Sequence, residues 1–401
     1  MSPLRKALLT FLLIFLPINS SLCIDMYLPA YPEIAQSFAV KEGDINLSMS
    51  LYLIGLALGQ LIYGPLADRF GRKRVLMVGL LIFVISSFAC TLTRNLDIFL
   101  LARLFQALGA CSCIVISRAI VTDIYPPKQR GTILAFISAA NIFSPALAPL
   151  FGGYLVQWFS WLAIFEVIAL VGVFMLVATL FLLPETLKNP DYQALQFKHM
   201  ANNLYRLFSY PMFVGYSLGI ALLFALAFIW VTYSPNILLN EFQIPPDQFG
   251  LFFLVPATGS TIGALLTAFC GARVGEKRFI GLGYTLVLLG VAILLSLMLR
   301  NYIDTPFKVI MPIMLIFLGI NMAQPLQVAS ALAPFTDIAG FTAGIIGFIQ
   351  ISAGACVALL TSSWYQAGND TMAFLMLSAA VLAFLGFGYA VRASLARDTS
   401  Y

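Results

Sequence analysis

Long runs of apolar residues, separated by short polar turns, fill most of the chain. A helix needs about 20 apolar residues to cross the hydrocarbon core of a bilayer, and these runs have that length. The pattern therefore predicts twelve membrane-spanning helices. These spans are Ala7 to Tyr31, Ile45 to Pro65, Val75 to Thr93, Asp97 to Val121, Thr132 to Val156, Trp161 to Leu183, Met212 to Leu238, Gln248 to Cys270, Phe279 to Leu299, Pro306 to Ser330, Gly340 to Trp364 and Thr371 to Val391.

The longest polar stretch, Glu185 to Tyr210, divides the spans six and six and contains the chain's one histidine, His199. We therefore expect a six-helix bundle over residues 1–184, a cytoplasmic linker over 185–211 and a second six-helix bundle over 212–401.

A weak internal repeat supports this division. Tyr27-Leu28-Pro29, at the end of the first span, resembles Tyr233-Ser234-Pro235 in the seventh. At a similar offset, Ala272 to Arg278 is a degenerate copy of Asp68 to Arg74. Such a repeat implies two bundles related by an axis along the membrane normal, with a substrate path between them. The predicted fold class is an all-α integral membrane protein built from two pseudo-symmetric halves.

Composition agrees with a membrane protein. Of the 401 residues, 61% are hydrophobic and 10% are charged, whereas about a quarter of the residues of a soluble domain are charged. Most of the surface should therefore face lipid. The first apolar run contains Pro17 and Asp25 and has no convincing cleavage site, so we expect a retained span rather than a signal peptide.

The distribution of Lys and Arg predicts the orientation. If the N-terminus lies inside, the outer turns hold only Lys41, Arg94, Arg300 and Lys308, and the inner turns hold most of the other Lys and Arg residues. This bias predicts that both termini are cytoplasmic. It also accounts for the net charge of +5 without a nucleic-acid partner. The six cysteines fall inside apolar helices, which indicates free thiols with no disulfide and no metal site.

Charged side chains inside a span are costly, on the order of 2.5 to 3.5 kcal/mol by insertion scales, and are functional candidates for that reason. Asp25 lies about six residues before the outer end of the first span, and Arg103 about six residues after the outer start of the fourth. At about 1.5 Å per residue the two have similar depth, so they are able to meet in the bundle interior. We expect Asp25 to take and release a coupled proton while Arg103 responds to its charge. The alternative is a permanent structural ion pair.

Glu166 is a second acid within a span, near the outer start of the sixth. The sequence leaves two interpretations open. Glu166 is either a second titrating site or a residue that reaches the membrane interface beside Trp158 and Trp161.

The turn between the second and third spans is short and strongly basic. Gly64 and Pro65 are expected to begin it, Gly71 lies inside it, and Asp68 stands among the cations Arg69, Arg72, Lys73 and Arg74.

Arg118, Asp123, Lys128 and Arg130 lie near the same membrane face. With Asp68 they are expected to form a charge network that joins helices in the outward-facing state and breaks when the inner gate opens. The alternative is a solvated basic surface.

Four stretches resemble the major facilitator superfamily, and within it the twelve-span drug:proton antiporters of the Bcr/CflA group, the bicyclomycin and chloramphenicol resistance transporters. They are Asp25 to Ala30, Gly64 to Arg74, Arg103 to Gly109 with Arg118 to Val121, and Ser144 to Gly153. The last resembles the antiporter motif, in which Pro145, Pro149, Gly152 and Gly153 would let the fifth span bend and pack tightly between the halves. Two departures from the group are Ser144, where Gly is usual, and the degenerate eighth-to-ninth turn.

The resemblance implies proton coupling through Asp25 and Arg103, with the proton gradient in place of a cofactor. Seven polar or aromatic residues are candidates for the substrate site, although hydrogen bonds between helices explain each of them as well. They are Tyr52, Asn141, Trp230, Tyr233, Asn321, Gln324 and Gln350. A site with few charges and many Phe suits an amphipathic or aromatic compound.

The leading hypothesis is a proton-driven exporter of drug-like compounds in the bacterial inner membrane, acting as a monomer. Export of a native metabolite such as a siderophore, or proton-coupled uptake by symport, are the alternatives. An enzyme is not expected, because the chain has no H-E-x-x-H motif and no phosphate-binding G-x-x-x-x-G-K-[ST] loop. A passive channel fits a buried acid and a two-half repeat less well.

Overall fold

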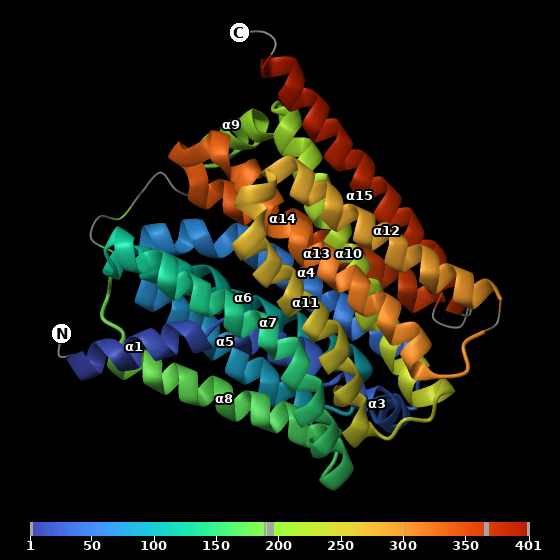
Figure 1. The fold of residues 1–401 in the computed structure, drawn as a ribbon. Helices are drawn as coiled ribbons and strands as arrows, with labels where there is room; N and C mark the ends of the chain where they lie inside the picture. The colour runs from blue at the N-terminus through green and yellow to red at the C-terminus, as the bar shows by residue number, and fades with distance from the viewer. Residues whose placement is uncertain (1–2, 188–189, 191–195, 301, 365–368, 399–401) are drawn as a thin grey trace. The chain divides into compact units, whose positions relative to one another are not determined.

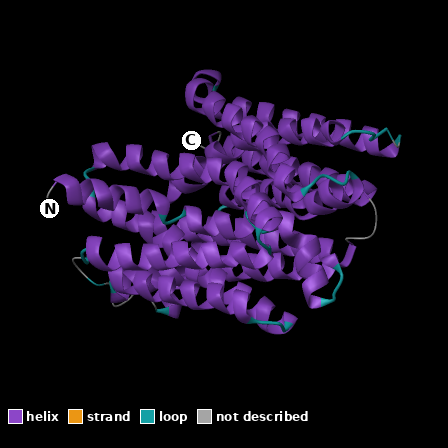
Figure 2. Ribbon diagram, turned by 90° about the horizontal axis from the view of Figure 1, so that it is seen from below, coloured by secondary structure: helices purple, strands orange, loops and turns teal. Residues whose placement is uncertain are grey.

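The computed structural model describes all residues except 1–2, 188–189, 191–195, 301, 365–368 and 399–401, so part of the predicted linker lies outside the described residues. Figure 2 shows that the described chain is helical, and no strand occurs in this part. Its contacts divide it into two compact units, Met1–Met200 and Ala201–Tyr401. The division falls inside the stretch expected to be the linker.

The first unit contains six long apolar segments (Figure 1). The first segment is broken into α1 (Pro3–Phe15), α2 (Ile18–Asp25), the short turn η1 (Leu28–Ala30) and α3 (Tyr31–Phe38). The others are α4 (Glu42–Phe70), α5 (Arg72–Leu92), α6 (Leu96–Ile124), α7 (Pro127–Trp158) and α8 (Trp161–Leu182).

The second unit begins near a short helix, α9 (Phe197–Phe208), in the predicted linker. It continues with α10 (Pro211–Pro235), the π-helical turn η2 (Asn236–Glu241), α11 (Pro246–Val274), α12 (Glu276–Leu299), α13 (Pro306–Leu332), the turn η3 (Ala333–Ile338), α14 (Ala339–Trp364) and α15 (Asn369–Asp398). Counting α1 to α3 as one span, the two units supply the twelve predicted spans.

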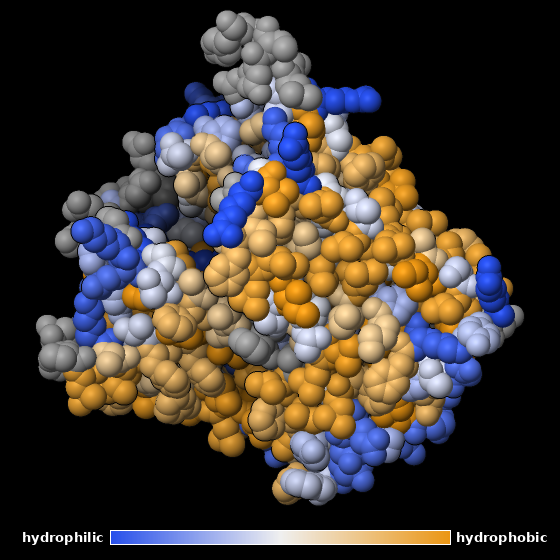
Figure 3. Space-filling view, in the orientation of Figure 1, coloured by the Kyte–Doolittle hydropathy of each residue, from blue (hydrophilic) through white to orange (hydrophobic). Residues whose placement is uncertain are grey.

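Length and hydropathy identify ten stretches able to cross a membrane among the described residues, and one of them, Pro306–Ser362, comprises most of α13 and α14. Apolar side chains also cover the outside of the helices. On α8, for example, Leu170, Phe174 and Phe181 are 62%, 60% and 70% exposed. Figure 3 shows hydrophobic residues along the helices and hydrophilic ones gathered near the ends. A surface of this kind requires lipid as its solvent.

Glycine lets the helices approach one another closely, and it does so in the same way in both units. Where Gly55 of α4 meets the backbone of Leu104, Gly259 of α11 meets that of Met314. A side chain at either position would collide with the facing carbonyl.

The helix pair α5 and α6 repeats the pattern in α12 and α13. Gly79 of α5 and Gly109 of α6 each lie against the other's helix, and Gly283 of α12 and Gly319 of α13 do the same. The turn residues also agree, because Gly71 and Gly275 have φ angles of 103° and 92°. The internal repeat expected from the sequence is thus present in the backbone.

The first span is broken at Pro17. Proline has no N–H to donate and disfavours continuation of the preceding helix, so α1 ends at Phe15 and α2 restarts at Ile18. The chain changes to a 3-10 turn at Leu28-Pro29-Ala30, directly after Asp25 and Met26. Asp25 therefore lies at the end of a short helix in the middle of a span.

The short helix α9 is tied to the junction between α13 and α14. Arg206 makes a bidentate ion pair with Asp337 at 2.5 and 3.2 Å, which raises the pKa of the Arg206 guanidinium, and the same guanidinium lies over the ring of Phe335. Phe335 also packs against Tyr210 and Phe213. The predicted linker thus contains an ordered helix, most of which lies in the second unit, and the sequence did not predict it.

The packing of α7 on the broken first span gives a prediction. A Cβ at Gly152 would collide with the carbonyl oxygen of Met26, whereas one at Gly64 would meet nothing within 4 Å. We expect Gly152→Ala to destabilise the protein by about 1 to 3 kcal/mol through overpacking. Gly64→Ala, in the interior of α4, should leave stability unchanged or raise it slightly. Thermal unfolding of the two variants in detergent, compared by apparent midpoint, checks this, and equal midpoints would contradict it.

Candidate functional site

The guanidinium of Arg103, on α6, is fully buried in the first unit. Nη1 donates to Oε1 of Gln106 at 2.6 Å, and Nη2 donates to the carbonyl oxygen of Cys23 at 2.9 Å. Gln106 in turn donates to Oγ of Ser87 at 2.9 Å. The partners of this buried cation are therefore neutral oxygen atoms on α6 and α2.

Three aromatic rings complete the surroundings of Arg103. Its Cζ lies 4.5 Å from the ring centroid of Tyr27, 4.4 Å from that of Tyr52 and 5.6 Å from that of Phe165. The negative face of an aromatic ring attracts a cation, most strongly where water is excluded. The rings thus stabilise a positive charge that has no ion-pair partner within the described part of the chain.

Asp25 lies two residues after the carbonyl that Arg103 binds and is 4% exposed. Among the described residues, no ion pair joins Asp25 to Arg103. The sequence predicted similar depth for the two groups, and the contact of Arg103 with the Cys23 carbonyl agrees with it. A direct contact between them is absent from this structure, because the guanidinium turns to the backbone of α2.

The second unit packs in the same way without this polar group. Counted from the matching glycines Gly109 and Gly319, Ile313 occupies the place of Arg103 and Ile316 that of Gln106. Both isoleucines are fully buried. At these two positions the same helix packing is therefore built from hydrocarbon side chains, so the fold itself does not require a cation at this place.

Glu166 is exposed on α8, whereas the adjacent Phe165 is buried against the Arg103 cluster. Among the described contacts Glu166 has no polar partner. Exposure alone leaves both interpretations of Glu166, a second titrating site or a residue at the membrane interface, as predictions. Trp158 is exposed like Glu166, but Trp161 is buried and donates to Ser37.

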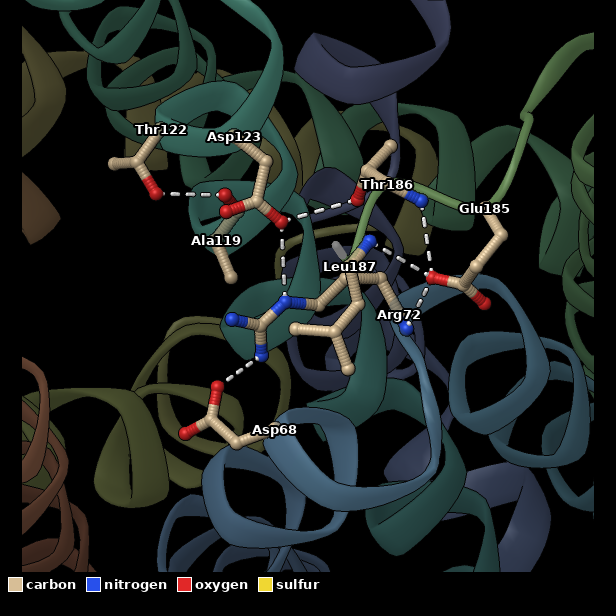
Figure 4. A network of polar contacts seen from close by, with 8 residues as sticks. All are labelled: Asp68, Arg72, Ala119, Thr122, Asp123, Glu185, Thr186 and Leu187. Atoms are coloured by element: carbon tan, nitrogen blue, oxygen red, sulfur yellow. Dashed lines mark hydrogen bonds and ion pairs between the residues drawn. The ribbon is translucent and has the colours of Figure 1, made fainter. Parts of the chain in front are cut away.

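A second polar cluster lies where α4, α5 and α6 end at the predicted cytoplasmic side (Figure 4). Arg72 pairs with Asp68 at 2.5 Å and with Asp123 at 3.2 Å. The backbone N–H of Arg72 donates to Glu185 at 2.8 Å, and Thr186 donates to Asp123 at 3.0 Å. The cluster thus joins the ends of three helices to the segment that follows α8.

This cluster differs from the predicted network in its members. Arg118 and Lys128 make no ion pair or hydrogen bond among the described residues, and Arg130 donates instead to the carbonyl of Tyr125 at 2.7 Å. Arg69 lies over the ring of Phe70. Arg72 takes the central place because it starts α5 directly after the turn, facing the ends of both α4 and α6.

The turn is also shorter than predicted. Gly64 and Pro65 lie inside α4, which continues to Phe70, and the chain reverses at Gly71 alone. A proline within a membrane helix is tolerated where neighbouring groups satisfy the freed backbone. The prediction that Gly64 and Pro65 begin the turn is therefore wrong.

The stretch resembling the antiporter motif lies in the continuous helix α7, with Pro145 and Pro149 in its interior. Gly152 and Gly153 are buried. Gly152 lies against the Met26 carbonyl, next to Asp25. Within the first unit, this stretch therefore fixes the end of α2 that carries the buried acid.

The predicted substrate residues have different surroundings. Tyr52 is buried, donates to the Ser20 carbonyl at 3.2 Å and belongs to the Arg103 cluster. Trp230 and Tyr233 are buried on α10, and the indole N–H of Trp230 lacks a partner among the described residues.

The four amide residues among the predicted substrate contacts are all half-buried. Asn141 and Asn321 each donate to a carbonyl of their own helix, four residues before them. The side-chain amide nitrogen of Gln324 has no partner in the described part of the chain, and Gln350 lies on α14. These contacts leave the role of each of the four in substrate binding a prediction.

Sequence reasoning missed Glu185 and the carbonyl of Cys23. A backbone acceptor has no signature in the sequence. Glu185 follows Pro184 at the end of an apolar run. Its carboxylate accepts from the first backbone N–H of α5, and an acid directly after a span was the available signal for such a cap.

The inner cluster gives a prediction with a matched control. Arg72→Met leaves two carboxylates without their common cation, and we expect it to cost about 1 to 3 kcal/mol. Arg118→Met removes a cation from the same membrane face that has no described partner, so stability should change little. Apparent unfolding midpoints of the two variants, at low and high salt, provide the check. Equal losses would show that Arg72 does not hold the helix ends together.

Comparison with known proteins adds relatives of two kinds. The chain is 27% identical over 365 residues to the bicyclomycin resistance protein homolog of Haemophilus influenzae, covering 91% of each chain. It is 26% identical to the multidrug resistance protein MdtL of Shewanella sp. strain ANA-3, covering 83% of each.

Solved structures share the fold at lower identity. The D-xylose-proton symporter matches with a TM-score of 0.76 at 16% identity, covering 97% of each chain. A bacterial homolog of the human lysosomal transporter Spinster matches with a TM-score of 0.73 at 16% identity, covering 98% of each. Residues 13–358 match the sequence profile of the Major Facilitator Superfamily. The chain therefore belongs to the Major Facilitator Superfamily, as a membrane-embedded transporter of small molecules and not an enzyme.

Proposed function

We propose that this transporter is a proton-coupled antiporter, which exports small amphipathic or aromatic compounds from the bacterial cytoplasm by alternating access. The observation that carries the proposal is the polar group around Arg103. Arg103 is a buried cation without a carboxylate partner among the described residues, and it bonds the broken helix that carries a buried acid, in one unit only. The second unit shows that the packing does not need such a group, so a functional reason must keep it there.

In the proposed cycle Asp25 is the proton carrier. In one state Asp25 is ionised, and the Arg103 guanidinium leaves the Cys23 carbonyl and pairs with the Asp25 carboxylate. In the other state Asp25 is protonated, and Arg103 is held by Gln106, the Cys23 carbonyl and the aromatic rings. The described geometry agrees with the second state. Because the same carbonyl belongs to α2, exchange between the states would shift the helix that carries Asp25.

The substrate class is inferred from the chemistry of the buried surface and from the relatives. The candidate substrate residues are aromatic or carry neutral amides, which suits an uncharged or aromatic compound better than a phosphate. Relatives of similar length are named for bicyclomycin resistance and multidrug resistance. We propose the same class here, in the bacterial inner membrane, with both termini cytoplasmic and the monomer as the working unit.

The test is proton release from purified protein at weak buffering in detergent, on adding bicyclomycin or chloramphenicol. Antiport requires substrate and proton to compete, so the native protein should release protons on binding. Asp25→Asn should abolish the release. Glu166→Gln, which neutralises the exposed acid of α8, is the matched control and should leave the release intact.

Three results would contradict this account. Proton uptake on binding would indicate symport. Equal release by the native protein and Asp25→Asn would make Asp25 structural. If a native metabolite such as a siderophore causes proton release and neither drug does, the proposed substrate class is wrong and the mechanism stands.

A further inference from the structure

Asn19 on α2, like Asn46 on α4, is a buried amide that the proposed function leaves unused. Its side chain has no exposed surface, and neither Oδ1 nor Nδ2 has a hydrogen-bond partner among the described residues. Burying an amide without partners is strongly unfavourable, and the great majority of buried polar atoms in folded proteins are paired. A donor and an acceptor must therefore reach Asn19.

The backbone around Asn19 shows which side of α2 it faces. Cys23 lies one helical turn further on, on the same stripe, and its carbonyl accepts from Arg103. The next residue, Ser20, offers its carbonyl to the hydroxyl of Tyr52, whose ring lies against the Arg103 guanidinium. Asn19 thus lies one turn below the Arg103 cluster, where α2 faces α4 and α6.

Arg103 contributes a further unpaired atom to the same region. Its Nε has no partner in the described part of the chain, although Nη1 and Nη2 are both bonded. Oδ1 of Asn19 needs a donor, while Nδ2 of Asn19 and Nε of Arg103 need acceptors. All three atoms are buried without a described partner, and such groups are what an ordered internal water satisfies.

The second unit supports this interpretation by contrast. If Tyr233-Ser234-Pro235 is matched to Tyr27-Leu28-Pro29, Ala225 takes the place of Asn19. Ala225 is buried, and no arginine lies at the place of Arg103. Where the buried cation is missing, the buried amide is missing too.

We propose that Asn19 and Arg103 bind internal water within the first unit, and that Asn19 is a positioning residue which acts through this water on Arg103. Water fits better than a polar group of the substrate, because Asn19 and Arg103 are both fully buried and their unpaired atoms need a molecule that both donates and accepts. The water site stands on the geometry alone. Its role, which is to solvate Arg103 while no carboxylate pairs with it, rests on the proposed function.

Radiolytic hydroxyl-radical labelling of the purified full chain tests the water site directly, since radicals formed from a bound water modify the side chains next to it. Cys23 and Cys111 are both buried with no exposed surface, and only Cys23 lies beside the proposed water. We expect Cys23 and Tyr52 to be modified several-fold faster than Cys111. Asn19→Leu, of similar size and apolar, should reduce labelling at Cys23 to the level of Cys111.

We also expect Asn19→Leu to lower the rate of drug-driven proton release. Asn19→Ser is the conservative rescue, because a serine hydroxyl still binds a water. In this variant the labelling of Cys23 and the rate of proton release should both return toward the native values. Labelling of Cys23 equal to that of Cys111 in the native protein would overturn the water site. Suppression of the labelling by saturating bicyclomycin would assign the place to the substrate instead. If Asn19→Leu reduces the labelling of Cys23 as expected but leaves the rate of proton release unchanged, only the role of Asn19 in coupling is overturned.

Discussion

A buried guanidinium is the constraint on which the rest of this structure depends. Arg103 has no exposed surface, and the groups that hold it are a glutamine, a backbone carbonyl and aromatic rings. Each of these interactions with the guanidinium is weak alone, and together they stabilise the charge only if all the groups are held in place. The broken first span supplies the carbonyl, because a regular helix would have used it for its own hydrogen bond.

The glycines explain how such a site is accommodated without disturbing the fold. Glycines Gly55, Gly79 and Gly109 allow α4, α5 and α6 to pack closely, and matching glycines make the corresponding contacts in the second unit. On this shared framework the second unit carries isoleucine at the places where the first carries Arg103 and Gln106. The proposed division of labour, with proton coupling in the first unit, follows from this difference in side chains, since the two frameworks are alike.

Much of the fold was predictable because bilayer thickness fixes helix length and lipid tolerates few polar side chains. The twelve spans, the internal repeat and the similar depth of Asp25 and Arg103 all follow from that. What the sequence did not predict depends on geometry that has no local signature. Pro65 resembles a helix end but lies within α4, and Arg103 bonds a backbone oxygen of α2 without an ion pair to Asp25 among the described residues. Glu185 and the helix α9 acquire their contacts only through tertiary packing.

The central claim is that the buried polar group of the first unit serves transport and is not needed for folding. Replacing Arg103, Gln106 and Ser87 together by Ile, Ile and Val, the residues at the matching places of the second unit, tests it most directly. In proteoliposomes the account predicts a folded variant that still exchanges substrate down its gradient but no longer accumulates it against one when a proton gradient is imposed. A variant that fails to fold would show that the group is structural, and one that still drives uphill transport would show that coupling lies elsewhere.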